Sequence, residues 1–348
     1  MSGIEAGAMQ RNYAIDFFKF FAIAAVVVIH TFPSDHELGF FFVDNFTRFA
    51  VPYFFAASGY LFGLKVKDNP HSWSYFKRYL WKILKIYLCW LLFYIGYDIV
   101  RIYLEHGGSI RGELSKYREN LTLRNLLYYG EGTSGYQLWF VIALVWSMTV
   151  LYGCFRMKKI GFLLMVSLGL NVAGLFGQSY AYFYELPVES TRDALYIGLF
   201  YTTLGFSFAS CRKPMRFRKW TYLIGFCLFA VLQAAEGYWL EKVLSAKHGE
   251  YFLSTIFLTV FLFLLTITCP NLGKGLWISK VGARSLGIYT IHVFFIDMVD
   301  LLFDGLGEGS VTHSVLWNVI DASLVFSASY LAYDVLQLVK NRIPSPQK

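Results

Sequence analysis

The sequence predicts an all-α integral membrane protein with about ten transmembrane helices, and two observations lead to this prediction. Hydrophobic residues make up 56% of the 348 residues and charged residues only 16%, whereas soluble domains carry roughly 45–50% and about 25%. The apolar residues also fall into blocks of about 18–22 between charged stretches, which is the length that a helix needs to cross a bilayer. This pattern excludes a disordered chain, a coiled coil and a disulfide-rich scaffold.

Ten blocks qualify as membrane-spanning helices. We expect them at 13–32, 46–64, 79–100, 138–155, 160–177, 193–211, 219–236, 252–269, 286–304 and 315–338. No repeat or Pro-rich linker divides the chain, so we expect residues 1–348 to form a single transmembrane domain with no appended soluble domain. Asp16 and Lys19 interrupt the first block and nine blocks follow it, so it is not expected to be a cleaved signal peptide.

Charge in alternate loops predicts the orientation. One set of loops holds 21 Lys and Arg residues against two acids, Glu5 and Asp68, and the other holds nine basic residues against fifteen acids. Because Lys and Arg collect on the cytoplasmic side of membrane proteins, both termini are expected to be cytoplasmic. The basic residues form short clusters between apolar blocks, without a continuous patch or motif that would indicate nucleic-acid binding.

One connection is long. Residues 101–137, on the acidic side, contain several charges and the stretch YYGEGTSGY. Structureless segments of this length are often functional, so this loop is either a lid or docking surface or a solvated connector.

The first block carries three ionisable residues, Asp16, Lys19 and His30. Such groups are costly inside a membrane and indicate functional sites by default. Lys19 and His30 are about three helical turns apart and therefore share one helix face, roughly 16 Å apart along the axis. Asp16 is one turn before Lys19 and can pair with it. The alternative is an interfacial Asp16–Lys19 pair with His30 marking the outer boundary.

Two further blocks carry polar residues of interest. Arg48 begins the second block and is either a snorkelling boundary residue or a cation beside His30. Ser58 and Gly59 lie deeper and allow close approach of a helix or an acyl chain; Ser58 lacks the GxSxG elbow of a nucleophile. In the ninth block, His292 is a second intramembrane histidine, with Tyr289 on nearly the same helix face.

The remaining ionisable residues give weaker signals. Asp297 and Asp300 either line the same cavity or approach the interface, and Asp98, Asp321 and Asp334 are interpreted as boundary residues. The sequence has five cysteines but no CxxC pair, no HExxH and no Walker A or GxGxxG motif. We therefore expect no metal and no bound cofactor.

The arrangement of these residues resembles the membrane acyltransferase 3 family. Lys19, ten intervening residues and His30 match the family's Lys/Arg-X10-His pattern. The similarity continues at Arg48 and Ser58-Gly59-Tyr60, at Leu138-Trp139-Phe140, and at Ser285-Leu286-Gly287-Ile288-Tyr289 with His292. It extends from residue 11 to about 295.

This resemblance implies an enzyme that moves an acyl group, usually acetyl, from cytoplasmic acyl-CoA to a hydroxyl of an envelope carbohydrate. It implies His30 as the catalytic histidine, with Lys19 and Arg48 as further catalytic residues. We expect the substrate-binding residues to be Asp16, Ser58, Trp139, Tyr289 and His292. A histidine is suited to be the general base that a hydroxyl acceptor needs. Lys19 lies near the cytoplasmic face, where the phosphates of CoA need cations. His30 acts either as a direct base or through an acyl-histidine intermediate.

The resemblance also leaves alternatives open. Many family members carry an extracellular esterase-like domain, whereas this chain ends about ten residues after the last predicted span, so it either completes the transfer alone or uses a separate extracytoplasmic partner protein. A related module precedes the racemase in vancomycin-resistance serine racemases, where it is associated with serine supply. The competing function is accordingly a transporter of small molecules or amino acids, although no inverted repeat is visible. In either case we expect a multi-pass protein of the bacterial cell membrane.

Overall fold

The computed structural model consists of helices and their connections, and describes residues 11–32, 43, 45–105, 110–211, 217–304 and 315–342. Within these ranges there is no β-strand. The α-helices are α1 (Tyr13–Thr31), α3 (Asn45–Thr47), α4 (Ala50–Val66), α5 (Ser72–Glu105), α6 (Ile110–Asn120), α7 (Trp139–Arg156), α8 (Ile160–Gly174), α9 (Leu199–Ser210), α10 (Lys219–Tyr238), α11 (Leu253–Thr268), α12 (Trp277–Gly282), α13 (Ser285–Asp304) and α14 (Val315–Arg342). The short π and 3-10 turns are η2 (Asn125–Tyr129), η3 (Tyr136–Leu138), η4 (Leu175–Gly177), η5 (Ser179–Tyr182), η6 (Ala194–Gly198) and η7 (Trp239–Val243).

Each of the ten predicted spans contains a helix. In the described part of the chain, eight helices are long and apolar enough to cross a membrane. The other two predicted spans, 193–211 and 252–269, contain the shorter apolar helices Ala194–Ser210 and Leu253–Thr268. The fold is therefore the multi-pass helical bundle that the apolar blocks predict, with two spans below full length.

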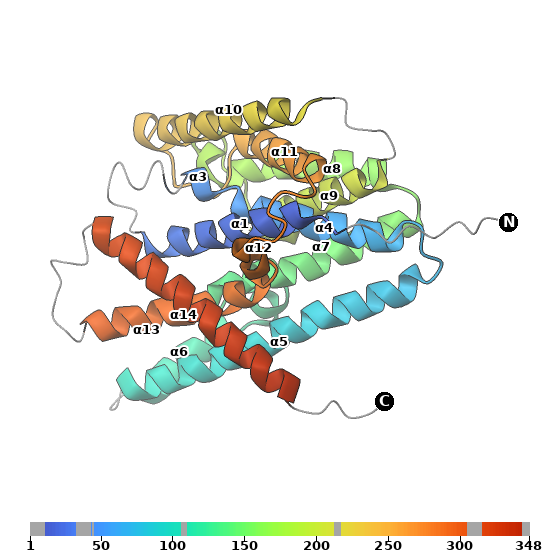
Figure 1. Ribbon diagram of the computed structural model, residues 1–348. Helices are drawn as coiled ribbons and strands as arrows, with labels where there is room; N and C mark the ends of the chain where they lie inside the picture. Colours follow the sequence, from blue (N-terminus) through green and yellow to red (C-terminus); the bar gives the residue numbers. More distant parts are fainter. Residues whose placement is uncertain are drawn as a thin grey trace.

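Most of the long helices run along one axis of the molecule, and α14 crosses them obliquely (Figure 1). We call the end where α5 begins and α7 ends the basic end; there, Ser72 Oγ and Tyr152 OH are hydrogen-bonded at 3.2 Å. We call the opposite end, where α5 and α13 finish, the acidic end; there, Arg101 pairs with Asp297 at 3.6 Å. These names follow the two sets of loops distinguished by charge in the sequence.

Helix α1 lies in the middle of the bundle, with α4, α12, α13 and α14 packed around it (Figure 1). It begins where the Asn12 side chain accepts a hydrogen bond from the backbone N–H of Ala14 at 3.0 Å, a usual helix cap. Small and branched apolar residues of α1, such as Ala22, Ile23 and Val26, are buried. The polar residues of the first predicted span are thus carried by a central helix with neighbours on several sides.

Helices α4 and α9 pack closely because a glycine of each faces the backbone of the other. A Cβ atom at Gly59 would lie 2.0 Å from the carbonyl oxygen of Thr202, and one at Gly205 would lie 1.9 Å from that of Ala56. Small residues at such positions let membrane helices approach closely. Of the predicted pair Ser58-Gly59, the glycine therefore serves helix packing.

The prediction of a structureless loop over 101–137 is wrong. Helix α5 has 34 residues and continues to Glu105, and helix α6 and turn η2 follow. The interpretation of Asp98 as a simple boundary residue is also wrong, because Asp98 is only 7% exposed. Its carboxylate accepts hydrogen bonds from Tyr117 OH at 2.7 Å and from the backbone N–H of Ser134 at 3.0 Å. A buried carboxylate thus organises this segment, and no local periodicity reveals such a contact.

Candidate functional site

Two histidines predicted from separate blocks come together in the centre of the bundle. His30, near the end of α1, and His292, in the middle of α13, stack with their ring centroids 5.5 Å apart and an interplanar angle of 29°. The Tyr136 ring meets His30 edge-on at 5.1 Å. His292 is fully buried and His30 partly buried, so the pair lies in an environment with little water.

The hydrogen bonding of His292 fixes which of its nitrogens can act on a substrate. Its Nδ1 donates to the backbone carbonyl of Tyr289 at 2.7 Å, because a carbonyl oxygen can only accept. A neutral imidazole in this state has an acceptor lone pair on Nε2. In the described part of the structure, Nε2 is buried without a hydrogen-bond partner. Buried polar atoms rarely stay unpaired, so this atom is suited to a substrate group.

A belt of hydrogen bonds holds the helix segment that carries His292. The Gln137 side chain donates to Tyr94 OH at 2.7 Å and to the carbonyl of Thr290 at 3.0 Å, and Tyr94 OH also donates to that carbonyl at 3.0 Å. Tyr289 OH donates to the backbone carbonyl of Gln137 at 2.7 Å. This belt joins α5, η3 and α13 beside the histidine pair.

A cavity of about 340 Å³ opens on the basic side of the pair. Three predicted site residues line it, Lys19, Ser58 and Tyr289, and Lys82 and Tyr79 line it as well. Its size lies within the range of about 300–1,000 Å³ usual for small-molecule sites. Neither histidine lines this cavity, but one of its lining residues, Tyr289, connects it to the pair, because the Tyr289 ring lies 5.6 Å from the His292 ring.

Two other predicted residues, Arg48 and Trp139, lie together on the acidic side. They line a small cavity of about 40 Å³ together with Glu250. Arg192 lies over the Trp139 ring at 5.4 Å and forms ion pairs with Glu250 at 2.9 Å and Glu131 at 3.5 Å. One guanidinium group, that of Arg48, therefore lines the cavity on the acidic side, and a second, that of Arg192, is held beside Trp139 by two carboxylates.

Arg48 is also held by a histidine. Its Nη2 donates to Nε2 of His248 at 2.6 Å, and His248 Nδ1 lies 3.1 Å from both carboxylate oxygens of Glu241. With Nε2 accepting, Nδ1 is the donor to Glu241. This chain of contacts fixes the direction in which the Arg48 guanidinium points.

Asp16 is the one predicted site residue that belongs neither to the histidine pair nor to the lining of these two cavities. Its carboxylate pairs with Arg11 at 2.6 Å, and among the described residues no ion pair joins it to Lys19. Lys19 instead faces the cavity on the basic side. The Asp16–Arg11 pair raises the pKa of Arg11, and Asp16 thus belongs to the surface at the beginning of α1.

Sequence reasoning missed Gln137, Arg192, His248 and Glu250. Gln137 directly precedes Leu138-Trp139-Phe140, and Arg192 precedes a helix at the acidic end just as Arg48 does. These positions are the signal in the sequence, because a polar residue directly before an apolar helix is a candidate site residue just as a polar residue within the helix is. The contacts of His248 and Glu250 join distant segments and have no local signature.

Comparison with known proteins agrees with this architecture. A family model described as an acyltransferase domain matches residues 12–334. An amino-acid racemase of Enterococcus faecalis is 27% identical over 311 residues, which are 83% of this chain and 42% of the racemase. A second amino-acid racemase of the same organism is 26% identical over 236 residues, 63% of this chain and 30% of the racemase. The chain thus spans less than half the length of these curated relatives, and no solved structure gives a significant match.

The family match includes the helices α1 to α13 and all the residues that form the histidine pair and the two cavities beside it. It supports an acyltransferase activity, and the long apolar helices make the protein a multi-pass membrane protein. The chain belongs to the acyltransferase 3 family.

Proposed function

We propose that the protein transfers an acyl group, acetyl in the simplest case, from cytoplasmic acyl-CoA to a hydroxyl of a cell-envelope carbohydrate. The observation that carries this proposal is the stacked His30–His292 pair, which has a cavity on its basic side and an arginine-lined cavity on its acidic side. A donor and an acceptor that approach from opposite sides of a membrane would meet at such a pair.

The donor enters from the basic end in this proposal. CoA carries phosphates, and Lys19 and Lys82 provide cations where the larger cavity opens. The cavity is too small for the whole of CoA and suits its narrow pantetheine arm. Phe54, Phe140 and Leu144 line the same cavity and provide apolar contact for the arm, so the thioester would lie near Tyr289 and the histidine pair.

His30 is the general base in the transfer step. It accepts the proton of the acceptor hydroxyl while the hydroxyl oxygen attacks the thioester carbonyl carbon. The C–S bond then breaks, the CoA thiolate leaves, and the proton held by His30 returns to that thiolate. In this proposal the guanidinium of Arg48 stabilises the negative charge that develops on the carbonyl oxygen, whereas Nε2 of His292 can only accept a hydrogen bond, for example from the acceptor hydroxyl.

A second route uses the same residues. Here His30 attacks the thioester itself, an acyl-histidine forms as CoA leaves, and the acceptor hydroxyl then takes the acyl group. The routes differ when the acceptor is omitted, because only the second leaves a labelled acetyl group on the protein. In either route the protein completes the transfer alone or receives the acceptor from a separate extracytoplasmic protein.

The proposal is tested by measuring loss of the acetyl-CoA thioester with purified protein in liposomes, for wild type and His30→Ala, with a panel of sugar acceptors. We expect release of CoA that depends on His30, with the variant retaining the helical content and elution profile of wild type. Full activity of His30→Ala would remove His30 from the mechanism.

A second function has one specific observation in its favour, the similarity to two amino-acid racemases. The region shared with them would carry an amino acid across the membrane rather than an acyl group. Liposome uptake of radiolabelled serine without acetyl-CoA, together with no acetyl-CoA binding, would support this transport function and exclude the acyltransferase.

A further inference from the structure

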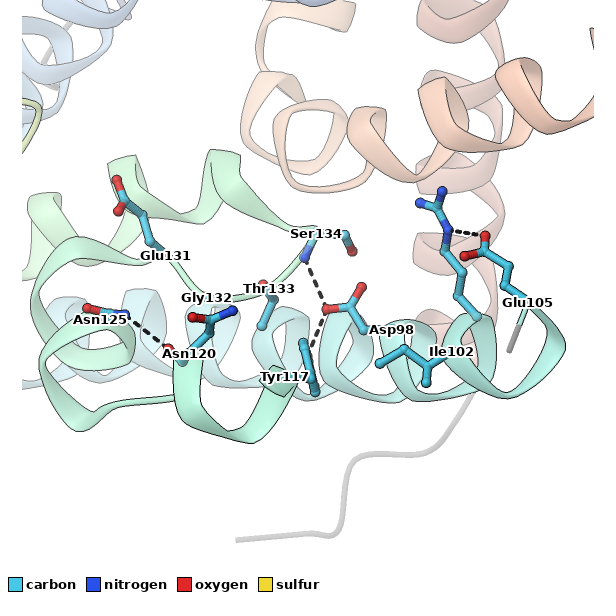
Figure 2. Close-up of a pocket in the computed structure, with 11 residues that line it drawn as sticks. Asp98, Ile102, Glu105, Tyr117, Asn120, Asn125, Glu131, Gly132, Thr133 and Ser134 are labelled. Carbon is cyan, nitrogen blue, oxygen red and sulfur yellow. Dashed lines mark hydrogen bonds and ion pairs between the residues drawn. The ribbon is translucent and has the colours of Figure 1, made fainter. Parts of the chain in front are cut away.

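A third and larger cavity, of about 530 Å³, opens at the acidic end between α5, α6 and residues 131–134 (Figure 2). Its lining combines polar side chains from several elements with the apolar side chain of Ile102. Asp98 and Arg101 come from α5, Tyr117 and Asn120 from α6, and Ser134 from the segment that leads to η3. We call this cavity the outer cleft.

The outer cleft adjoins the histidine pair through two elements. The segment that forms its wall continues into Tyr136, whose ring contacts His30 at 5.1 Å. On α5, Asp98 is one helical turn beyond Tyr94, which donates to the carbonyl of Thr290 at 3.0 Å. A ligand in the cleft would therefore lie next to the segments that frame the reacting groups.

Asp98 provides an acceptor that is nine-tenths buried and directed at the cleft. Both of its hydrogen bonds, from Tyr117 OH and from the Ser134 N–H, use the same oxygen, Oδ2, as Figure 2 shows. In the described ranges, both hydrogen bonds of the Asp98 carboxylate leave Oδ1 as an acceptor for a ligand, and the hydroxyl Oγ of Ser134 is buried without a partner. Burial and the neighbouring Asp98 carboxylate raise the pKa of Tyr117, so Tyr117 stays protonated and keeps donating to Asp98.

The charge of the lining selects against anions. Three carboxylates, Asp98, Glu105 and Glu131, face one cation, Arg101. That cation is already paired with Glu105 at 2.7 Å and with Asp297 at 3.6 Å. Glu131 is paired with Arg192 at 3.5 Å, so an anionic ligand would meet carboxylates and no unpaired cation among the residues that line the cleft. Hydroxyl groups, by contrast, can donate to the carboxylates and exchange hydrogen bonds with the Asn120 amide.

We propose that the outer cleft binds the acyl acceptor as a neutral sugar and discriminates against anionic sugars. This inference rests on the proposed acyltransferase function, because it assigns the acceptor to a particular cavity. The acceptor hydroxyl to be acylated would point past residues 134–136 toward His30, and the rest of the sugar would occupy the cleft.

The test compares a neutral sugar, N,N′-diacetylchitobiose, with an anionic one, glucuronic acid, as acceptors for labelled acetyl-CoA. Two variants change the cleft in different ways: Asp98→Asn removes one acceptor charge, and Ile102→Trp fills the cleft from α5 without removing a hydrogen bond. We expect each variant to raise the half-saturating concentration of the neutral sugar about tenfold. The half-saturating concentration of acetyl-CoA is expected to change less than twofold. Glu119→Gln, on the exposed face of the same helix α6, is the matched control and leaves both values unchanged.

Direct binding of the neutral sugar, measured by saturation-transfer NMR without acetyl-CoA, separates this inference from the proposed function. Binding that is lost in Ile102→Trp supports the cleft even where no acetyl transfer is found, which would contradict the proposed function alone. Equal use of both sugars, or acetyl transfer and sugar binding that are unaffected by both variants, would overturn the cleft assignment.

Discussion

At the residue scale, the site depends on charges and lone pairs that the surrounding helices orient. His292 has one nitrogen committed to the backbone carbonyl of Tyr289 and one without a partner among the described residues. Lys19 faces a cavity, whereas its neighbour on the helix, Asp16, turns to Arg11. The roles of these residues therefore follow from what each side chain faces and not from residue type alone.

Lys19 is expected to contribute to donor binding. Lys19→Ala removes a cation from the cavity on the basic side, and a hydrogen bond to a charged group is worth about 1.5–3 kcal/mol. We therefore expect the KM for acetyl-CoA to rise about tenfold or more with kcat little changed, measured by steady-state CoA release. Lys85→Ala, one turn from Lys82 but outside the cavity lining, is the control. A fall in kcat with an unchanged KM would assign Lys19 to the chemical step instead.

His248 is expected to act as a positioning residue for Arg48. His248→Ala leaves Arg48 without the acceptor that lies 2.6 Å from its guanidinium, so we expect kcat to fall about tenfold with the KM for acetyl-CoA unchanged. His248→Gln keeps an acceptor and a donor in the side chain and is expected to restore part of the rate. Lys247→Ala, which breaks only an exposed pair with Glu185, is the control. Wild-type kcat in His248→Ala would show that Arg48 needs no such support.

At the scale of elements, the length of α5 explains the architecture of the acidic end. Its 34 residues span about 51 Å at 1.5 Å per residue, whereas a bilayer core is about 30 Å thick. The apolar pattern marks only the part within lipid, which is why the predicted span 79–100 is shorter than the helix. Asp98 lies at the end of the predicted span and Arg101 in the extension beyond it, and helix α6 packs against this part of α5 to form the outer cleft.

The α4–α9 contact gives a prediction for stability. Gly205→Ala places a Cβ where the Ala56 carbonyl lies, and such overpacking costs about 1–3 kcal/mol. We expect a thermal unfolding midpoint several degrees below wild type, measured in detergent by scanning fluorimetry. Gly153→Ala, in α7, is the matched control because a Cβ there meets nothing within 4 Å. An unchanged midpoint for Gly205→Ala would mean that the two helices separate without cost.

At the scale of the whole molecule, the sequence pattern predicts where the helices are but not which of their side chains contact one another. Apolar blocks predict each span because lipid imposes a length and a composition on every helix. His30 and His292 could be recognised singly because an ionisable group inside a span is unusual. Their stacking depends on how α1 and α13 pack, and the contacts of Arg192 with Glu131 and Glu250 join three connections that are distant in sequence. No local pattern encodes such contacts.

The orientation of the bundle decides whether the proposed chemistry can occur, because acyl-CoA is available only in the cytoplasm. The cavity that we propose for the donor is lined by Lys19 and Lys82 on the side of the basic end, so the proposed function requires that end to be cytoplasmic. The test uses single cysteines at two exposed positions, Lys159→Cys at the basic end and Glu185→Cys at the acidic end, after replacement of the five native cysteines. We expect a membrane-impermeant maleimide to label Glu185→Cys in intact cells and Lys159→Cys only after permeabilisation. The reverse pattern would mean that the cavity opens toward the outside of the cell, where its lysines could not bind cytoplasmic acyl-CoA.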